Sequence, residues 1–157
     1  MKRKMAGYFL LGLLILFLAL FVYFFVGSQK QAEKITWGVS FSQHQAESLG
    51  LDWRAVYTAL LDGLSAERLK ISVDWNRVAP EKGKFVFDDI DWQVAEAEKR
   101  GVDLLLVMGM RTPRWPECHI PKWAQGLSKD EQQKEMLSLL EQVVTRYKDS
   151  ASIAYCQ

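Results

Sequence analysis

Side chains that could bind a polar ligand gather in the segments that follow three apolar runs of the sequence. His44 follows the first run, Arg77 follows the second, and Arg111 and Trp115 follow the third. Imidazole, guanidinium and indole groups donate hydrogen bonds, and an indole ring also packs against flat apolar surfaces. The sequence shows no Ser-His-Asp or Cys-His signature of a nucleophile with its base. These four residues are therefore candidates for binding a ligand.

The remaining reactive residue types do not form a recognisable site. His44 lies far along the chain from Cys118-His119, and this spacing fits no common metal-ligand motif. The paired acids at positions 88–89 and 96–98 are typical of a helix cap and of a solvated helix face. We therefore predict no metal, no cofactor and no catalytic carboxylate pair among these residues.

The elements that position the candidates alternate between short apolar runs and amphipathic stretches. Strands are predicted at 35–41, 68–75, 102–110 and from 152 onward. Helices are predicted from the apolar spacing that runs from Trp53 to Leu64, from Asp88 or Asp89 up to Gly101, and after a capping box of Ser128 and Glu131.

This alternation predicts an α/β fold in which helices cover a parallel sheet, as in a TIM barrel or a doubly wound sheet. No glycine-rich nucleotide-binding motif follows the first strand. The loops after the strands carry the Trp, His and Arg residues, and those loops form the functional face of a barrel. We therefore predict a (β/α)8 TIM barrel over residues 35–157, represented by about its first four strands.

An uncharged apolar segment, Tyr8 to Val26, precedes this domain. As a helix it would be about 29 Å long, close to the thickness of the bilayer core. A cleaved signal peptide, with an apolar region of about 7–15 residues, is the alternative. We predict a cytoplasmic tail and transmembrane anchor over 1–27 that contacts lipid through residues 8–26, and a linker over 28–34.

Charge predicts the orientation of this anchor. Lys2, Arg3 and Lys4 directly precede the span, so the amino terminus is expected in the cytoplasm and the following domain outside it, in a single-pass membrane protein. Without these three cations, the remaining 17 Lys and Arg face 19 Asp and Glu, a net charge of −2 that argues against binding nucleic acid. On the exported side, Cys118 and Cys156 could form a disulfide or remain free thiols.

The segment from Val73 to Met108 resembles the second strand, the following loop and helix, and the third strand of clan A retaining glycoside hydrolases. These TIM-barrel enzymes share W-x-R-[IV]-x-P, then G-x-[FY]-x-[FW], an Asp near the helix start and a Gly before the next strand. The matching residues are Trp75, Arg77, Val78, Pro80, Gly83, Phe85, Phe87, Asp91 and Gly101. "TPRWP", Thr112 to Pro116, is similar to the P-x-W that follows the third strand in several of these families.

The resemblance implies roles for the candidate residues. Arg77 would hydrogen-bond the nucleophilic carboxylate and keep it ionised, the alternative being an ion pair with Asp74 or Asp91. Trp115 would stack on a sugar ring, or else only pack its loop.

His44 could hydrogen-bond a sugar hydroxyl, and Arg111 lies just past the third strand at the sugar-facing end. For His44, a structural role or a solvated position is the alternative. Trp37 and Trp75 are predicted to pack the barrel.

The resemblance also implies that both catalytic glutamates fall outside this sequence. In the clan, the acid/base Glu closes the fourth strand, in a pattern like I-x-x-[WY]-x-[ILV]-x-N-E, and the nucleophile lies on strand seven. "SIAYCQ", Ser152 to Gln157, resembles the start of that fourth strand. Retaining hydrolysis needs both carboxylates about 5–5.5 Å apart. We therefore expect part of a sugar site without its catalytic pair.

Two functions are compatible with these features. The first is the N-terminal part of a membrane-anchored, extracytoplasmic glycoside hydrolase that cleaves β-linked glycosides by a retaining mechanism. The second is a non-catalytic, membrane-anchored module that binds a glycan or a complementary C-terminal half-barrel, because four strands cannot close a barrel.

Overall fold

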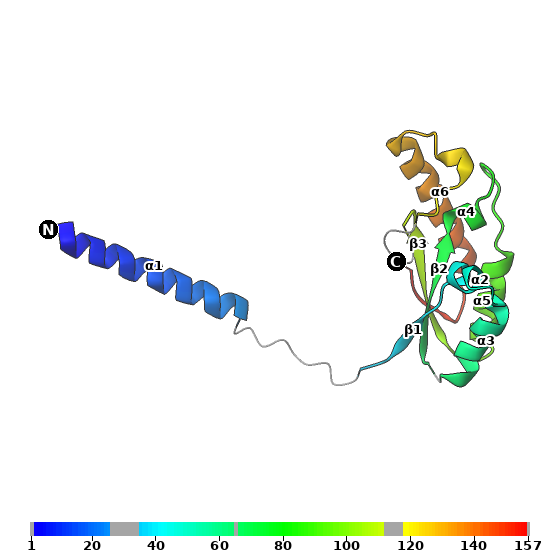
Figure 1. Ribbon diagram of the computed structural model, residues 1–157, viewed down its shortest axis with the longest axis horizontal. Coiled ribbons are helices and arrows are strands. Elements are labelled where there is room, and N and C mark those ends of the chain that lie inside the picture. Colours follow the sequence, from blue (N-terminus) through cyan, green and yellow to red (C-terminus); the bar gives the residue numbers. More distant parts are fainter. Residues whose placement is uncertain (1, 26–34, 65, 112–117, 157) are drawn as a thin grey trace. The chain divides into compact units, whose positions relative to one another are not determined.

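The computed structural model describes residues 2–25, 35–64, 66–111 and 118–156, in two compact units, Met1–Ile35 and Thr36–Gln157. The first unit contains helix α1, Lys2–Phe25 (Figure 1). Within α1, the 19 residues Gly7–Phe25 have a mean hydropathy of 2.7 and are long and apolar enough to cross a bilayer. The predicted apolar helix is present, and its insertion into a membrane stays a prediction.

The second unit is built on a four-stranded sheet with the order β1-β2-β3-β4. The strands are β1 (Gly38–Ser40), β2 (Arg68–Asp74), β3 (Asp103–Gly109) and β4 (Ile153–Cys156), and each neighbouring pair is parallel. A doubly wound sheet reverses its strand order at a switch point, whereas a TIM barrel keeps the order of the sequence. The observed order confirms the predicted partial barrel.

The three long helices of this unit lie where the sequence predicts them: α3 (Trp53–Gly63), α5 (Asp88–Glu98) and α6 (Lys129–Tyr147). Helix α3 is capped by Asp52, whose Oδ1 accepts hydrogen bonds from the amides of Arg54 and Ala55. Helix α6 opens with the predicted capping box of Ser128 and Glu131. These caps satisfy amide groups that have no partner within the helix.

Three short elements were not predicted: α2 (Gln43–Ser48), α4 (Trp75–Val78) and the 3-10 helix η1 (Lys122–Ala124). Each is too short for an apolar period of 3.6 residues to show in the sequence. Two of them change the setting of predicted site residues, because His44 lies in α2 and Arg77 lies in α4.

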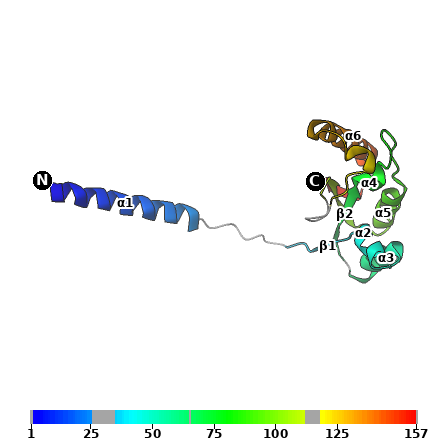
Figure 2. The ribbon, with the colours of Figure 1, turned by 45° about the horizontal axis from the view of Figure 1, so that its top comes forward.

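The core lies between one face of the sheet and the long helices. Leu69 pairs in register with Leu104, and Ile71 pairs with Leu106. All four side chains are buried, together with Tyr57 of α3, Val94 of α5 and Leu139 of α6. Figures 1 and 2 show α3, α5 and α6 on this side of the sheet. The packing is that of a barrel's outer layer.

The opposite face of the sheet carries Lys70, Ser72, Leu105 and Val107, which are half-buried. Strand residues alternate between faces, so this is the face that would line the interior of a closed barrel.

Strand β1 is shorter than predicted, and the packing role predicted for Trp37 is wrong. The strand begins at Gly38, and Trp37 before it is 80% exposed. Because β1 pairs only with β2, no described segment covers Trp37 on the other side. By contrast, Trp75 is 1% exposed and packs edge-on against Trp123. Trp75 belongs to α4 and not to the strand in which it was predicted.

Two glycines, Gly101 and Gly63, test how backbone conformation affects stability. Gly101, just past α5, has a φ of 65°, and a Cβ there would meet no atom within 4 Å. Gly101→Ala should therefore cost about 1 kcal/mol through the backbone alone. Gly63→Ala, in the last turn of α3 with equally open surroundings, should stabilise by about 0.5–1 kcal/mol. Urea unfolding of the full chain in nanodiscs would measure both, and two changes of the same sign would contradict this reading.

Candidate functional site

The candidate site lies at the edge where the strands end. Helix α2 follows β1, α4 follows β2 directly, and the segment after β3 returns across α4. The Asn76 amide donates to the His119 carbonyl at 2.9 Å, and Trp123 Nε1 donates to the Ala79 carbonyl at 2.9 Å. These bonds fix residues that follow β2 and β3 against each other at the functional face of a barrel.

Arg77 is held between two carboxylates. It forms a two-pronged salt bridge with Glu47 of α2, in which Nη1 donates to Oε1 at 3.2 Å and Nη2 donates to Oε2. Its Nε lies 3.7 Å from Asp74 Oδ2. Burial alone would raise the pKa of Glu47, but hydrogen bonds from Arg77 and Gln43 outweigh it and lower the pKa. Glu47 is therefore ionised at neutral pH.

Asp74, the last residue of β2, is 3% exposed, and its Oδ1 lies 3.9 Å from Nε2 of the equally buried His119. Among the described residues, no hydrogen-bond donor reaches this Oδ1. Burial raises the pKa of Asp74, against the opposing effects of His119, a hydrogen bond from Ser72 and Arg77. A polar group buried without full satisfaction is costly, which is a common mark of a functional site.

His44 belongs to the same cluster. It is exposed on α2, and its ring lies edge-on to the His119 ring with centroids 5.6 Å apart. The structure therefore places two predicted site residues, His44 and Arg77, in one cluster. In this cluster Glu47 bonds to Arg77, and His119 lies against His44.

The alternative predicted for Arg77, an ion pair with Asp74 or Asp91, is correct for Asp74 only. The ion pair with Asp74 is present, but Asp91 binds elsewhere: both of its oxygens accept from Arg146, and Oδ1 also accepts from the Tyr147 hydroxyl at 2.7 Å. Asp91 thus joins α5 to α6. The ion pair with Asp74 is compatible with the site role predicted for Arg77, which stays a prediction.

A glutamine network beside the cluster positions α2. Gln43 Nε2 donates to Asp89 Oδ2 at 2.8 Å and to Glu47 Oε1 at 3.1 Å, and Gln93 Nε2 lies 3.4 Å from Gln43 Oε1. A cavity of about 190 Å³ adjoins these groups, lined by Gln43, Ser72, Asp74, Arg77, Val78, Val86, Asp88, Asp89 and Ile90. The cavity is polar on the side where β2 ends.

The other two predicted residues are not part of this cluster. Arg111 is exposed after β3 and lines a separate cavity of about 520 Å³ beside α6. Trp115 lies outside the described residues. Cys118 is exposed with a free thiol, and the side chain of Cys156 lies outside the described part of the chain.

Sequence reasoning missed Glu47, Asp74 and His119 as members of a site. The sequence indicates Asp74 only as an ion-pair partner of Arg77, and it places His119 in a Cys-His pair whose spacing fits no common metal-ligand motif. The available signal was position, because all three follow the carboxyl end of a strand or close it. In the described ranges, no group of three or more His, Cys, Asp and Glu side chains is placed to hold a metal ion.

The cluster combines charged donors and acceptors at a partly open edge. The Arg77 guanidinium, the Glu47 carboxylate and the His44 imidazole can bond hydroxyl groups of a ligand, and bonds to charged groups are stronger than neutral ones. The arrangement suits a ligand rich in hydroxyls.

Asp74 gives the site a distinctive pH dependence. Its pKa is raised in the folded chain, so its contribution to stability is present below the ordinary Asp pKa and is lost as pH rises through the folded pKa. Relative to wild type, Asp74→Asn should therefore gain unfolding free energy as the pH rises above the ordinary Asp pKa of about 4. Urea unfolding of the wild-type and Asp74→Asn chains at a series of pH values would measure this gain. If Asp74→Asn instead lost unfolding free energy relative to wild type as the pH rises, the raised pKa of Asp74 would be contradicted.

No protein-family profile and no curated protein matches the sequence. Solved structures do match in fold. A β-galactosidase from the Antarctic haloarchaeon Halorubrum lacusprofundi has a TM-score of 0.57 and 21% identity over 78% of this chain and 21% of its own.

Two GH5_18 proteins are similar as well. The Streptomyces cattleya structure, in complex with GlcNAc, has a TM-score of 0.64 and 13% identity, covering 81% of this chain and 34% of its own. A GH5_18 variant from Bifidobacterium longum, in complex with Manβ1-4GlcNAc, has a TM-score of 0.62 and 14% identity over 79% of this chain and 32% of its own. The chain thus shares the fold of part of a glycoside hydrolase barrel and spans about a fifth to a third of the length of these structures.

Proposed function

We propose that residues 36–157 form the first half of a retaining glycoside hydrolase barrel and that the edge where β1, β2 and β3 end binds carbohydrate. The observation that carries this proposal is Arg77, which lies directly after β2 between Asp74 and Glu47. The sequential order of the strands and the likeness to glycoside hydrolase structures support it.

In this proposal, the residues of the chain bind and orient a sugar. His44 and the Arg77–Glu47 pair bond its hydroxyls, and the buried Asp74 holds the guanidinium in place. The two carboxylates of double displacement, an acid/base and a nucleophile, would be supplied by strands beyond those in this sequence. Arg77 would then support the nucleophile, as the clan resemblance implies.

Helix α1 would hold this half-barrel at the outer face of a membrane. The apolar length of Gly7–Phe25 supports a span, and the three cations at its start support a cytoplasmic amino terminus. The sugar would then be met outside the cytoplasm.

Saturation-transfer NMR tests the binding step, because it detects weak ligands. The full chain in phospholipid nanodiscs is mixed with Manβ1-4GlcNAc, the disaccharide bound by one of the similar structures. We expect saturable transfer to the sugar, and empty nanodiscs provide the background. Absence of transfer at millimolar sugar would remove the proposal.

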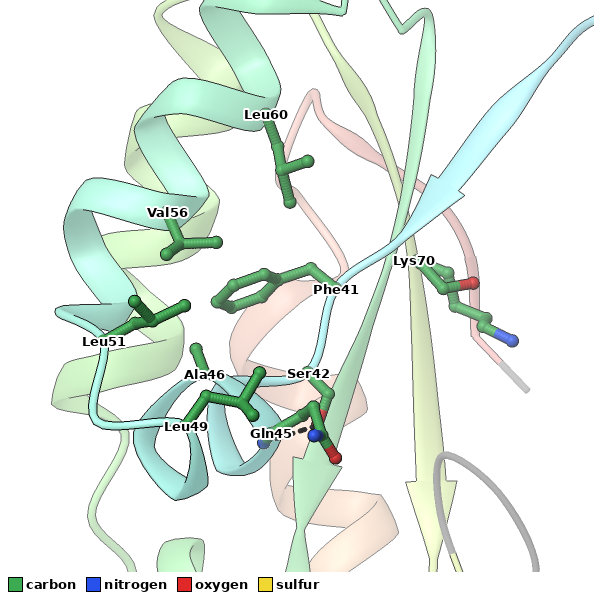
Figure 3. Close-up of a pocket in the computed structure, with 10 residues that line it drawn as sticks. Phe41, Ser42, Gln45, Ala46, Leu49, Leu51, Val56, Leu60 and Lys70 are labelled. Carbon is green, nitrogen blue, oxygen red and sulfur yellow. Dashed lines mark hydrogen bonds between the residues drawn. The ribbon is translucent and has the colours of Figure 1, made fainter.

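A second candidate function, docking of a complementary half-barrel, is favoured by a groove at the free edge of β1. The groove has a volume of about 450 Å³. Figure 3 shows Phe41 directed toward Val56 and Leu51, with Ala46 and Leu49 below, while Lys70 points away. An apolar groove beside a parallel strand with one free edge fits a further strand and the helix that packs with it.

Hydrogen exchange tests this second candidate. Amides of β1 should exchange faster than those of β2 and β3, which have a strand on both sides. Co-expression with a polypeptide carrying the last four β/α units of a similar barrel should slow exchange in β1. The same rate with and without that polypeptide would eliminate this candidate.

A further inference from the structure

A second cavity at the same edge of the sheet has a different chemical character from the Arg77 cluster. It has a volume of about 520 Å³, within the range of roughly 300–1,000 Å³ for small-molecule pockets. Its lining residues are Met110, Arg111, Cys118, Ile120, Lys129, Gln132 and Gln133. They come from the segment after β3 and from the first turns of α6.

Among the described residues that line this cavity, the two charged ones, Arg111 and Lys129, are both cations. Both are exposed, and neither forms an ion pair with any other residue that the structure describes. The first turn of α6 also carries the acids Asp130 and Glu131, but neither lines the cavity, and Glu131 Oε2 accepts hydrogen bonds from the amide and hydroxyl of Ser128. The positive end of the α6 dipole adds to the same potential. The cavity is therefore suited to an anion.

The uncharged lining is suited to a sugar ring. Met110 and Ile120 offer apolar side chains to the C–H face of a pyranose. Gln132 Nε2 donates to the carbonyls of Ala124 and Leu127, so its Oε1 remains available to accept from a hydroxyl. Gln133 adds a second amide.

We propose that this cavity is a subsite for an anionic sugar unit, in which Arg111 and Lys129 bind a carboxylate or sulfate ester and Met110 and Ile120 contact the ring. The inference rests on the proposed function and narrows its substrate class to acidic glycans. It also gives Arg111 a role separate from that of Arg77.

The free thiol of Cys118 reports occupancy, because it lines the same cavity and is exposed. The full chain carrying Cys156→Ser, in nanodiscs, is alkylated with N-ethylmaleimide in the presence of methyl β-D-glucuronide. We expect the glucuronide to slow alkylation saturably, with half-protection at about a tenfold lower concentration than for the neutral methyl β-D-glucoside. Glucose 6-sulfate distinguishes sulfate from carboxylate as the preferred group.

Matched variants locate the effect. Arg111→Met and Lys129→Met should each raise the half-protecting glucuronide concentration about tenfold. Lys134→Met removes a cation from α6 outside the cavity and should leave it unchanged. Equal protection by the two glycosides, or full protection in Arg111→Met, would overturn the inference. If neither glycoside protects while Manβ1-4GlcNAc still binds, the inference fails and the proposed function stands; if no sugar binds at all, both fail.

Discussion

Replacing Arg77 by methionine is expected to weaken binding of Manβ1-4GlcNAc by at least about tenfold. The substitution keeps most of the aliphatic stem but removes the guanidinium that bridges Glu47 and Asp74. The two carboxylates would then face each other without a cation, and α2 would lose its bond to α4. Saturation-transfer titration in nanodiscs measures the change. Arg77→Lys, which keeps the charge without the fork of donors, should recover only part of the affinity.

Arg68→Met is the matched control for this prediction. Arg68 is also ion-paired, but it opens β2, at the end of the strand opposite α4, and lies 3.8 Å from Asp103, with both side chains about half exposed. A surface pair of this kind contributes about 0–1 kcal/mol to stability, so the fold should tolerate its loss. Affinity for the sugar should be unchanged. Equal losses in the Arg68 and Arg77 variants would show that the sugar does not bind where the strands end.

Leu104→Ala is expected to lower the free energy of unfolding by about 2–5 kcal/mol. Leu104 is fully buried on the central strand β3, where it pairs in register with Leu69 of β2 on one side and with Ile153 of β4 on the other. The side chains of α3, α5 and α6 close over this face, so the deletion would leave a cavity. Urea unfolding followed by tryptophan fluorescence measures the loss.

Leu105→Ala removes the same number of atoms from the next residue of β3, on the opposite face. Leu105 is half-buried, and no helix in the described part of the chain covers it, so the cost should stay below about 1.5 kcal/mol. The difference between neighbouring leucines tests whether the core lies only on the outer side of the sheet. Similar costs for the two would mean that the inner face is also packed.

The main elements of the fold could be predicted because each has a local signal. The periods of α3 and α6, the capping box at Ser128 and the alternation of Leu69, Ile71 and Val73 all read directly from the sequence. The strand order could only be narrowed to two alternatives, because pairing between strands is not local. Short helices such as α2 and α4 gave no period to detect.

The candidate site was only partly predictable for the same reason. His44 and Arg77 stood out by residue type after predicted strands, but their meeting depends on where α2 and α4 place them. No sequence feature distinguishes Glu47 from the other acids, and it joins the candidate site only through its bond to Arg77. His119 is buried and belongs to the segment after β3 that returns across α4. No spacing in the sequence indicates that crossing.

Amide chemical-shift mapping of the ¹⁵N-labelled full chain in nanodiscs tests the central claim most directly. During titration with Manβ1-4GlcNAc, the account predicts saturable shifts in Gln43–Ser48, in Trp75–Val78 and at His119, and none at Arg68 or Asp103. Shifts confined to the amino ends of the strands, or to Leu49, Leu51, Val56 and Leu60 of the groove beside β1 (Figure 3), would contradict the claim that the sugar binds where the parallel strands end.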